Sequence, residues 1–502
     1  MVSWKSKTFL KILLKSVFKC SHPVEFINQY LARIKISFHI LPLLLVFGIN
    51  FAVGFVLFPR CTVAMIKRRN LLQGIGLNAI LWPLSLRAAD TYRLSETFSP
   101  GNRFRIQTTS ELTGGMVFTS NLQPKKTIQI KGKSQIDFDE TILTLDSSLK
   151  VSKSFREYRK VELSRTLDGQ NQETTLRPET RSLVLLRQGL KKTPFSPNAL
   201  LTWNELDLIR TEVFPCALAG LFPTRSVGLN ESWDAGLEAV QELTDLELLE
   251  SSQVSCKLDS VNLVNNRKTA RISFLGKASG INEDGPNQQI LDGYIFFDCE
   301  TRHLSFLYLK GTSILKNKEG KDVGRIEGRY TLSREMLPAI LLDNKILAQY
   351  EPDANNTRLL FESRDTAFTF HHPREWKVTS QSDSQATLDH SKESGLLITK
   401  EKPSRYTSNA MYRDAALAFI RQQQMRIESQ GEIQSANGIL GLEFFSWDVQ
   451  IESRRMYLLY FVYRIGQNVF TLASRCPQEN KAALRSDIIG IATSIKPTGK
   501  SG

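Results

Sequence analysis

The chain has 502 residues and a formal net charge of +14, and this length is enough for two or three domains. Residues 1–89 hold twelve Lys and Arg side chains against a single acidic one, Glu25, so this leader carries +11 and the remaining 413 residues carry +3. Because the part after residue 89 is close to neutral, the sequence argues against a nucleic-acid-binding protein.

Residues 1–64 contain an apolar run, Ile36–Phe58, of 23 residues. A helix of that length crosses the apolar layer of a bilayer, which is about 30 Å thick. Two interpretations stay open: the run is a genuine membrane anchor, or translation starts at Met65 and residues 1–64 are a misassigned start. An organellar transit peptide is a third possibility, which so apolar a run disfavours.

Residues 65–89 have the layout of an export signal: a basic start, a short apolar segment and small residues at Ala88 and Ala89. Arg68, Arg69, Leu71 and Leu72 resemble the Arg-Arg-x-Leu-Leu signal of twin-arginine export. That resemblance implies recognition by the export machinery and a folded product in the periplasm or cell envelope. The alternative is that the basic residues flank a membrane helix, but the glycine-broken segment is too short to span.

Residues 90–336 are dominated by period-two alternation, which predicts strands. Gly293–Asp298 and Leu304–Leu309, separated by a turn at Cys299–Arg302, predict a hairpin. Trp233–Leu249 is predicted to be a helix packed on the sheet. Its acidic run is predicted to be a solvated face of that helix; the run consists of Glu242, Asp245, Glu247 and Glu250.

The cysteines after residue 89 follow no zinc-binding spacing. Cys256 and Cys299 both lie in strand-like sequence, so a disulfide between them is possible in an oxidising compartment. The alternative is that they are free, buried thiols. The adjacent histidines His371 and His372 would point to opposite faces of a strand and cannot readily share one metal ion. We therefore expect no metal site and no cofactor.

The long antiparallel strands of residues 90–336 resemble the half-barrel lipoprotein carriers of the LolA/LolB type. This resemblance implies a concave face that binds a lipid or acyl chain. The alternative is that the apolar inward face is simply packed core. A concave apolar cavity would favour the carrier, and a filled core would favour a scaffold.

Residues 337–357 are predicted to form a short apolar helix and a linker. Residues 358–497 contain a Pro373-x-x-Trp376 motif and a helix that follows the capping residues Thr407 and Ser408 and has Ile427 on its apolar side. A central strand is predicted at Met456–Tyr463, and a closing helix after Pro477 has an apolar stripe of Leu484, Ile488, Ile491 and Ala492. Together these features resemble PsbP-like domains. That family implies an antiparallel sheet sandwiched by helices and a role in assembly. The predicted fold class is thus α+β: a β-rich antiparallel, half-barrel-like domain followed by an α/β sandwich with an antiparallel sheet.

No nucleophile elbow, phosphate loop or zinc-protease motif is present, and Ser313–Lys316 matches S-x-x-K within a predicted strand. The leading hypothesis is an exported, non-enzymatic binding or assembly protein of the cell envelope. The alternatives are a carrier of a lipid or other apolar ligand, and an enzyme of unknown type. The expected partners are the export machinery and a lipid or envelope protein, with membrane contact only through the N-terminal segment.

Overall fold

The computed structural model describes residues 90–498 except 121–122, 211, 283–284, 318, 364–365, 402–407, 432–433, 436–440 and 452. The apolar run 36–58 and the export-signal residues Arg68, Arg69, Leu71 and Leu72 lie outside the described residues. Within the described ranges, no helix is long and apolar enough to cross a bilayer.

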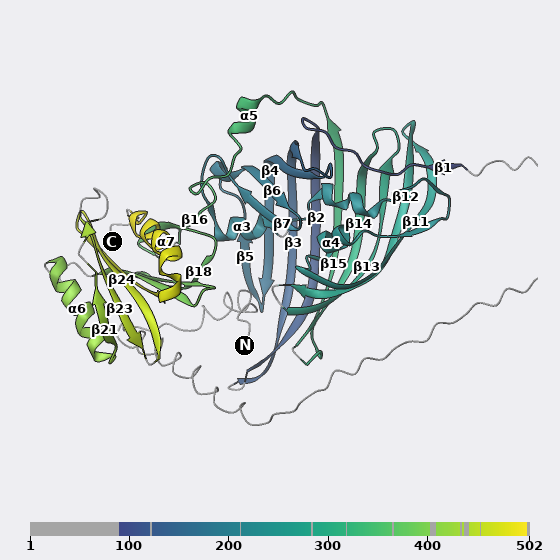
Figure 1. Ribbon diagram of the computed structural model, residues 1–502. Helices are drawn as coiled ribbons and strands as arrows, with labels where there is room; N and C mark the ends of the chain where they lie inside the picture. The colour runs from purple at the N-terminus through teal and green to yellow at the C-terminus, as the bar shows by residue number, and fades with distance from the viewer. Residues whose placement is uncertain are drawn as a thin grey trace, which may run out of the picture. The chain divides into compact units, whose positions relative to one another are not determined.

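Twelve strands of residues 103–337 form one open, antiparallel sheet (Figure 1). Its order is β10-β11-β12-β13-β14-β15-β2-β3-β4-β6-β7, and β5 pairs with β4. Apolar and polar residues alternate along these strands, which gives the sheet a buried inner face and an exposed outer face. The strands are β2 (Arg103–Ser120), β3 (Gln123–Leu145), β4 (Val151–Leu167), β5 (Gln170–Thr174), β6 (Ser182–Gln188), β7 (Lys191–Phe195), β10 (Ser232–Asp234), β11 (Leu248–Val264), β12 (Arg267–Asn282), β13 (Gly285–Asp298), β14 (His303–Lys316) and β15 (Asp322–Leu337). The predicted hairpin is β13–β14.

The inner face is packed against the segment that connects β7 to β11. Side chains of α3 (Trp203–Arg210), η3 (Pro215–Leu221) and α4 (Leu237–Thr244) join those of the strands in one core cluster. The predicted helix 233–249 is shorter than expected, because Trp233 belongs to β10 and Asp245, at φ 51°, ends α4 in the left-handed conformation. The chain's own side chains therefore fill the part of the inner face that this segment covers.

The C-terminal sheet has the order β18-β19-β20-β25-β24-β23-β21, with β22 paired to β23. The predicted central strand is confirmed, since β24 lies between β23 and β25 and a separate core cluster packs on each of its faces. The elements are β18 (Trp376–Gln381), β19 (Gln385–His390), β20 (Ser394–Glu401), α6 (Asn409–Gln422), β21 (Arg426–Gln430), β22 (Gln434–Ser435), β23 (Leu442–Ile451), β24 (Arg454–Ile465), β25 (Asn468–Pro477), η4 (Gln478–Asn480) and α7 (Lys481–Thr493).

Local sequence signals account for both helices of this part. The Ser408 side chain accepts a hydrogen bond from the Met411 amide and caps α6 as predicted. The closing helix is α7, and its predicted apolar stripe of Leu484, Ile488, Ile491 and Ala492 is buried. Ile427, expected on the helix, instead belongs to β21. The α+β fold class with antiparallel sheets is confirmed.

Short strands form two further small sheets, β1-β9 and β26-β17-β16-β8. β1 (Thr91–Tyr92) pairs with β9 (Val227–Gly228), and β17 (Phe368–His372) pairs with β26 (Lys496–Pro497). β16 (Leu359–Phe361) pairs with β17 and, in parallel, with β8 (Leu201–Thr202). The predicted apolar helix after Met336 is largely absent: β15 continues to Leu337 and only α5 (Asn344–Ala348) is helical. The remaining 3-10 turn is η2 (Pro178–Thr180).

Candidate functional site

Two rows of side chains cross the outer face of the first sheet. Strand pairing places residues in direct register, so each row runs perpendicular to the strands over seven of them. The first row, from β12 to β4, is Arg271, Phe296, Phe306, Ser333, Gln107, Asp137 and Lys160. The second is Ser273, Tyr294, Tyr308, Thr331, Thr109, Gln135 and Glu162.

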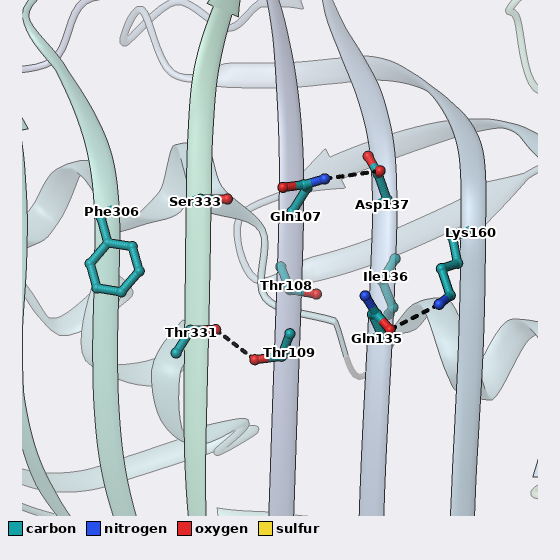
Figure 2. Close-up of a pocket in the computed structure, with 10 residues that line it drawn as sticks. All are labelled: Gln107, Thr108, Thr109, Gln135, Ile136, Asp137, Lys160, Phe306, Thr331 and Ser333. Carbon is teal, nitrogen blue, oxygen red and sulfur yellow. Dashed lines mark hydrogen bonds between the residues drawn. The ribbon is translucent and has the colours of Figure 1, made fainter.

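The polar residues of these rows, which lie on β15, β2, β3 and β4, line most of a shallow pocket of about 200 Å³ (Figure 2). Gln107 Nε2 donates to Asp137 Oδ2 at 3.0 Å, and Lys160 Nζ donates to Gln135 Oε1 at 2.9 Å. The hydroxyls of Thr109 and Thr331 are 2.6 Å apart. Amides and hydroxyls therefore dominate the pocket, and each keeps donor or acceptor capacity beyond these contacts.

The charges beside the pocket are balanced. Arg105 donates to both carboxylate oxygens of Asp137, from Nε at 3.2 Å and from Nη2 at 2.8 Å. The hydrogen bond from Arg105 holds the pKa of Asp137 below its usual value, so this carboxylate stays ionised as an acceptor. Lys160 lies 3.1 Å from Glu162. A ligand here would meet hydrogen-bonding groups without a strong field of either sign.

The aromatic half of the rows is a block of four rings on β13 and β14. The rings of Tyr294 and Tyr308 stack at 5.4 Å, and those of Phe296 and Phe306 lie 5.9 Å apart. All four are only partly buried, and the guanidinium of Arg271 lies 5.1 Å from the Tyr294 ring. Aromatic rings that are partly accessible on the outer face, beside a polar pocket, offer an apolar surface to a ligand.

A second polar group is buried under the inner face. Arg156 Nε donates to Glu140 at 2.8 Å, Arg156 Nη1 donates to Glu212 at 2.9 Å, and Tyr158 donates to Glu212 at 2.9 Å. Burial raises the pKa of Glu212, against the opposing effect of Arg156. Arg156 Nη2, Glu212 Oε1 and the Tyr330 hydroxyl have no hydrogen-bond partner in the described structure. This group joins β3, β4 and the connection after α3.

The prediction that Glu242 lies on a solvated helix face is wrong. Its side chain is buried on α4, 2.8 Å from Lys192 Nζ, and it also accepts from the Phe214 amide. Arg187 lies 3.6 Å from the same carboxylate. An acidic run cannot show which of its members turn inward, because that depends on basic side chains brought in by β6 and β7.

Of the two alternatives for Cys256 and Cys299, the free thiols are found and the possible disulfide is not formed. Cys256 pairs with Phe274 of β12, whereas the Cys299 amide donates to the carbonyl of Lys268. Those two β12 positions are six residues apart, which corresponds to about 20 Å at about 3.3 Å per residue, and a disulfide needs Cα atoms within about 7 Å. Burial raises the pKa of Cys256 to about 12.

The other candidate residues lie apart from both groups. His372 is buried and His371 is half-buried, on opposite faces of β17 as predicted. Ser313 and Lys316 lie in β14. No cluster of three or more His, Cys, Asp or Glu side chains that could hold a metal ion occurs among the described residues.

Sequence reasoning missed the residues of both groups. Glu140 had a usable signal: it follows Ile136 and Phe138 at the same period-two position and is therefore placed on the apolar face. For the outer rows the only signal was aromatic residues at the exposed positions of β13 and β14. Their alignment with Gln107 and Gln135 depends on strand order and register, which one sequence does not reveal.

Comparison with known proteins identifies no family, since neither a family model nor a curated protein matches. A structure described as showing lipid–protein interactions in lipovitellin is 11% identical, with a TM-score of 0.30, and covers 49% of this chain. The chain spans only 26% of that lipovitellin chain.

Two smaller solved structures match part of the chain. The Ran-binding protein Mog1p of Saccharomyces cerevisiae is 7% identical with a TM-score of 0.23, over 29% of this chain and 97% of its own. The cyanobacterial PsbP of Synechocystis is 12% identical with a TM-score of 0.22, over 28% of this chain and 92% of its own. A PsbP structure is thus among those similar to the chain, but all three TM-scores lie below 0.5 and carry no argument about function.

Proposed function

We propose that the protein is an exported, non-enzymatic binding protein of the cell envelope that holds a neutral, hydroxyl-rich ligand, a glycan chain, against the outer face of its first sheet. The observation that carries the proposal is the register that aligns the ring block of β13 and β14 with the polar pocket of β2 and β3. The described inner face is packed core, which favours a protein that binds on its surface.

The two halves of the rows match the two kinds of surface on a sugar. The C–H face of a pyranose packs on aromatic rings such as Tyr294 and Tyr308, and its hydroxyl or acetamido groups hydrogen-bond to amides and hydroxyls such as Gln107 and Gln135. The balanced charges around Asp137 disfavour a strongly ionic ligand. A row perpendicular to the strands gives a chain of sugars a continuous track.

The test is calorimetric titration of the full chain with a hexamer of β-1,4-linked N-acetylglucosamine. We expect saturable binding that weakens about tenfold in Tyr294→Ala and in Gln135→Ala, since each loses about 1–2 kcal/mol of contact. Gln288→Ala is the matched control, because Gln288 lies on β13 six residues from Tyr294. Absence of binding to this and to other neutral glycans would overturn the proposal.

A carrier of an apolar ligand is the second candidate, favoured by the ionic contacts between the inner face and the segment that covers it. Arg156 on β4 meets Glu212, and Arg187 on β6 meets Glu238 at 3.1 Å. A cover needed only for stability would be expected to be apolar, because buried ion pairs often stabilise less than apolar contacts. Stoichiometric binding of a monomeric short-chain phospholipid that Gln135→Ala leaves unchanged would favour this carrier over the glycan-binding protein.

A further inference from the structure

Several connections of the first sheet lie at the same end of its strands, and four of them carry or adjoin exposed apolar side chains. Those four are the turns β3–β4 (146–150), β6–β7 (189–190) and β11–β12 (265–266), and the segment 338–341 that follows β15. The register requires this, because Leu337 pairs with Arg103, Arg103 pairs with Thr141 near the end of β3, and Lys153 pairs with Leu186 near the end of β6. We call this end the rim; it is the upper end of the sheet in Figure 1.

The rim gathers large apolar side chains that point into solvent. Leu341 is 96% exposed, Leu149 is 75% exposed and Leu263 is 71% exposed. The remaining exposed apolar side chains of the rim are Leu190, Val264, Met336 and Ile340. At the opposite end only Leu248 and Ile281 are exposed in the same way among the described residues. Isolated exposed leucines are ordinary, but this grouping marks an interaction surface.

Two of the rim turns contain residues in the left-handed backbone conformation. Leu149 has φ 60° and Asn265 and Asn266 have φ 50° and 63°, all in the left-handed region. A leucine in that region costs about 1 kcal/mol or more, and the exposed side chain of Leu149 recovers none of it through packing in the isolated protein. The segment after β15 is fastened by the Ile340 amide, which donates to Gly101 O at 3.0 Å.

Basic side chains accompany the apolar ones in sequence. Lys150 follows Leu149, Lys191 follows Leu190, and Arg267 and Lys268 follow the β11–β12 turn. Lys150 pairs with Glu238, and Arg267 pairs with Asp298 at 3.3 Å. The acidic residues of the same end are Asp146, Glu300 and Asp343, and the Asp146 carboxylate accepts from the Ser148 and Lys150 amides of its own turn. The β3–β4, β6–β7 and β11–β12 turns thus combine exposed apolar side chains with cations next to them in the chain.

We propose that the rim inserts its apolar tips into the interface of an anionic lipid bilayer. Apolar side chains on the tips of separate turns enter a bilayer surface together, whereas a protein partner would need them to form one continuous patch. Lysines beside them reach the anionic headgroups while their aliphatic stems stay among the acyl chains. This surface is distinct from the glycan rows, which lie on the outer face of the sheet.

The test uses an environment-sensitive fluorophore on a single introduced cysteine of the full chain. The native Cys20, Cys61 and Cys299 are replaced by serine, and Ser148→Cys carries the probe on the rim. Glu319→Cys carries it on the β14–β15 turn, at the opposite end. Vesicles contain phosphatidylethanolamine and phosphatidylglycerol, some with a quencher on the acyl chains. Because the readout is local, attachment through the apolar run 36–58 does not imitate it.

We expect vesicles to shift the emission of the Ser148 probe to the blue and to quench it, with no change at Glu319. Leu263→Ser should weaken this quenching about tenfold in titrations against lipid. Leu275→Ser is the matched control, because Leu275 is 62% exposed but lies on β12 away from the rim. Unchanged emission at Ser148, equal changes at both probes, or equal effects of the two leucine variants would each overturn the proposal.

Discussion

Arg156 shows how one buried charge depends on its neighbours. Burial disfavours the charged guanidinium, yet Glu140 and Glu212 raise its pKa well above its usual range. The three side chains are at most 2% exposed. Removing the arginine would leave two carboxylates confined in the core, and neither could reach water without breaking the packing between β4 and the segment after α3.

We therefore expect Arg156→Leu to lower the free energy of unfolding by about 3–5 kcal/mol, the usual cost of an uncompensated buried charge. Arg159→Leu is the control, because Arg159 is 53% exposed although it also pairs with a carboxylate, that of Asp139. Its effect should stay within about 1 kcal/mol. Urea denaturation followed by circular dichroism measures both, and equal losses would contradict the structural role assigned to Arg156.

At the scale of the element, glycine occurs in a strand where the neighbouring strands leave no room for a side chain. Gly293 on β13 is such a position, because a Cβ there would overlap the Phe274 ring and the Tyr308 carbonyl. Gly311 on the neighbouring β14 would meet nothing within 4 Å. The predicted hairpin is confirmed. The difference in free space between Gly293 and Gly311 was not predictable from it, because the Phe274 ring is brought against Gly293 by the neighbouring strand β12.

Gly293→Ala should destabilise the protein by about 1–3 kcal/mol, as expected for overpacking. Gly311→Ala should be neutral or slightly stabilising, since alanine reduces the conformational entropy of the unfolded chain. Thermal unfolding of the two variants beside the parent protein checks the difference. A loss of stability in Gly311→Ala as large as that in Gly293→Ala would show that the close approach at β13 is not the cause.

At the scale of the whole molecule, the described residues have separate main cores, one in residues 94–359 and others in residues 361–495. The two parts hold titratable groups with opposite effects. Burial lowers the pKa of His372 to about 4 in the C-terminal part. Burial raises the pKa of Glu212 in the first part. Acid should therefore act differently on the two.

Above pH 6.5 His372 is neutral in both the folded and the unfolded chain. Between pH 6.5 and about 4 the unfolded chain binds the proton first, so the C-terminal part loses up to about 3 kcal/mol. Glu212 contributes the reverse, because its folded form binds a proton more readily than the unfolded chain does, and this favours the first part as pH falls. Hydrogen exchange resolved by segment, corrected for intrinsic rates, should show residues 361–495 weakening most between pH 6.5 and about 4.5. Carboxylates of the first part with a lowered pKa, such as Glu205, lose their contribution only below that window.

His372→Gln removes this titration and should reduce the response of the C-terminal part to acid, while His371 and His390, whose pKa values burial also lowers, still titrate. Ser408→Ala offers a control in the same part: it removes the cap of α6, costs about 1 kcal/mol at every pH, and should leave the acid response unchanged. If His372→Gln responded to acid as strongly as the parent protein, burial of this imidazole would not be the source of the effect.

The sequence by itself determined the strand-rich first part, the β13–β14 hairpin, the capped α6, the central β24 and the buried stripe of α7. Each of these predictions depends on residues that lie close together in the sequence, through period-two spacing, helical spacing or a helix cap. Tertiary structure alone decided that Glu242 is buried against Lys192, that Cys256 and Cys299 lie far apart, and that two rows of side chains align across seven strands. Those features depend on register and strand order, which bring together residues such as Thr109 and Thr331, 222 positions apart. A local sequence pattern does not identify such distant partners.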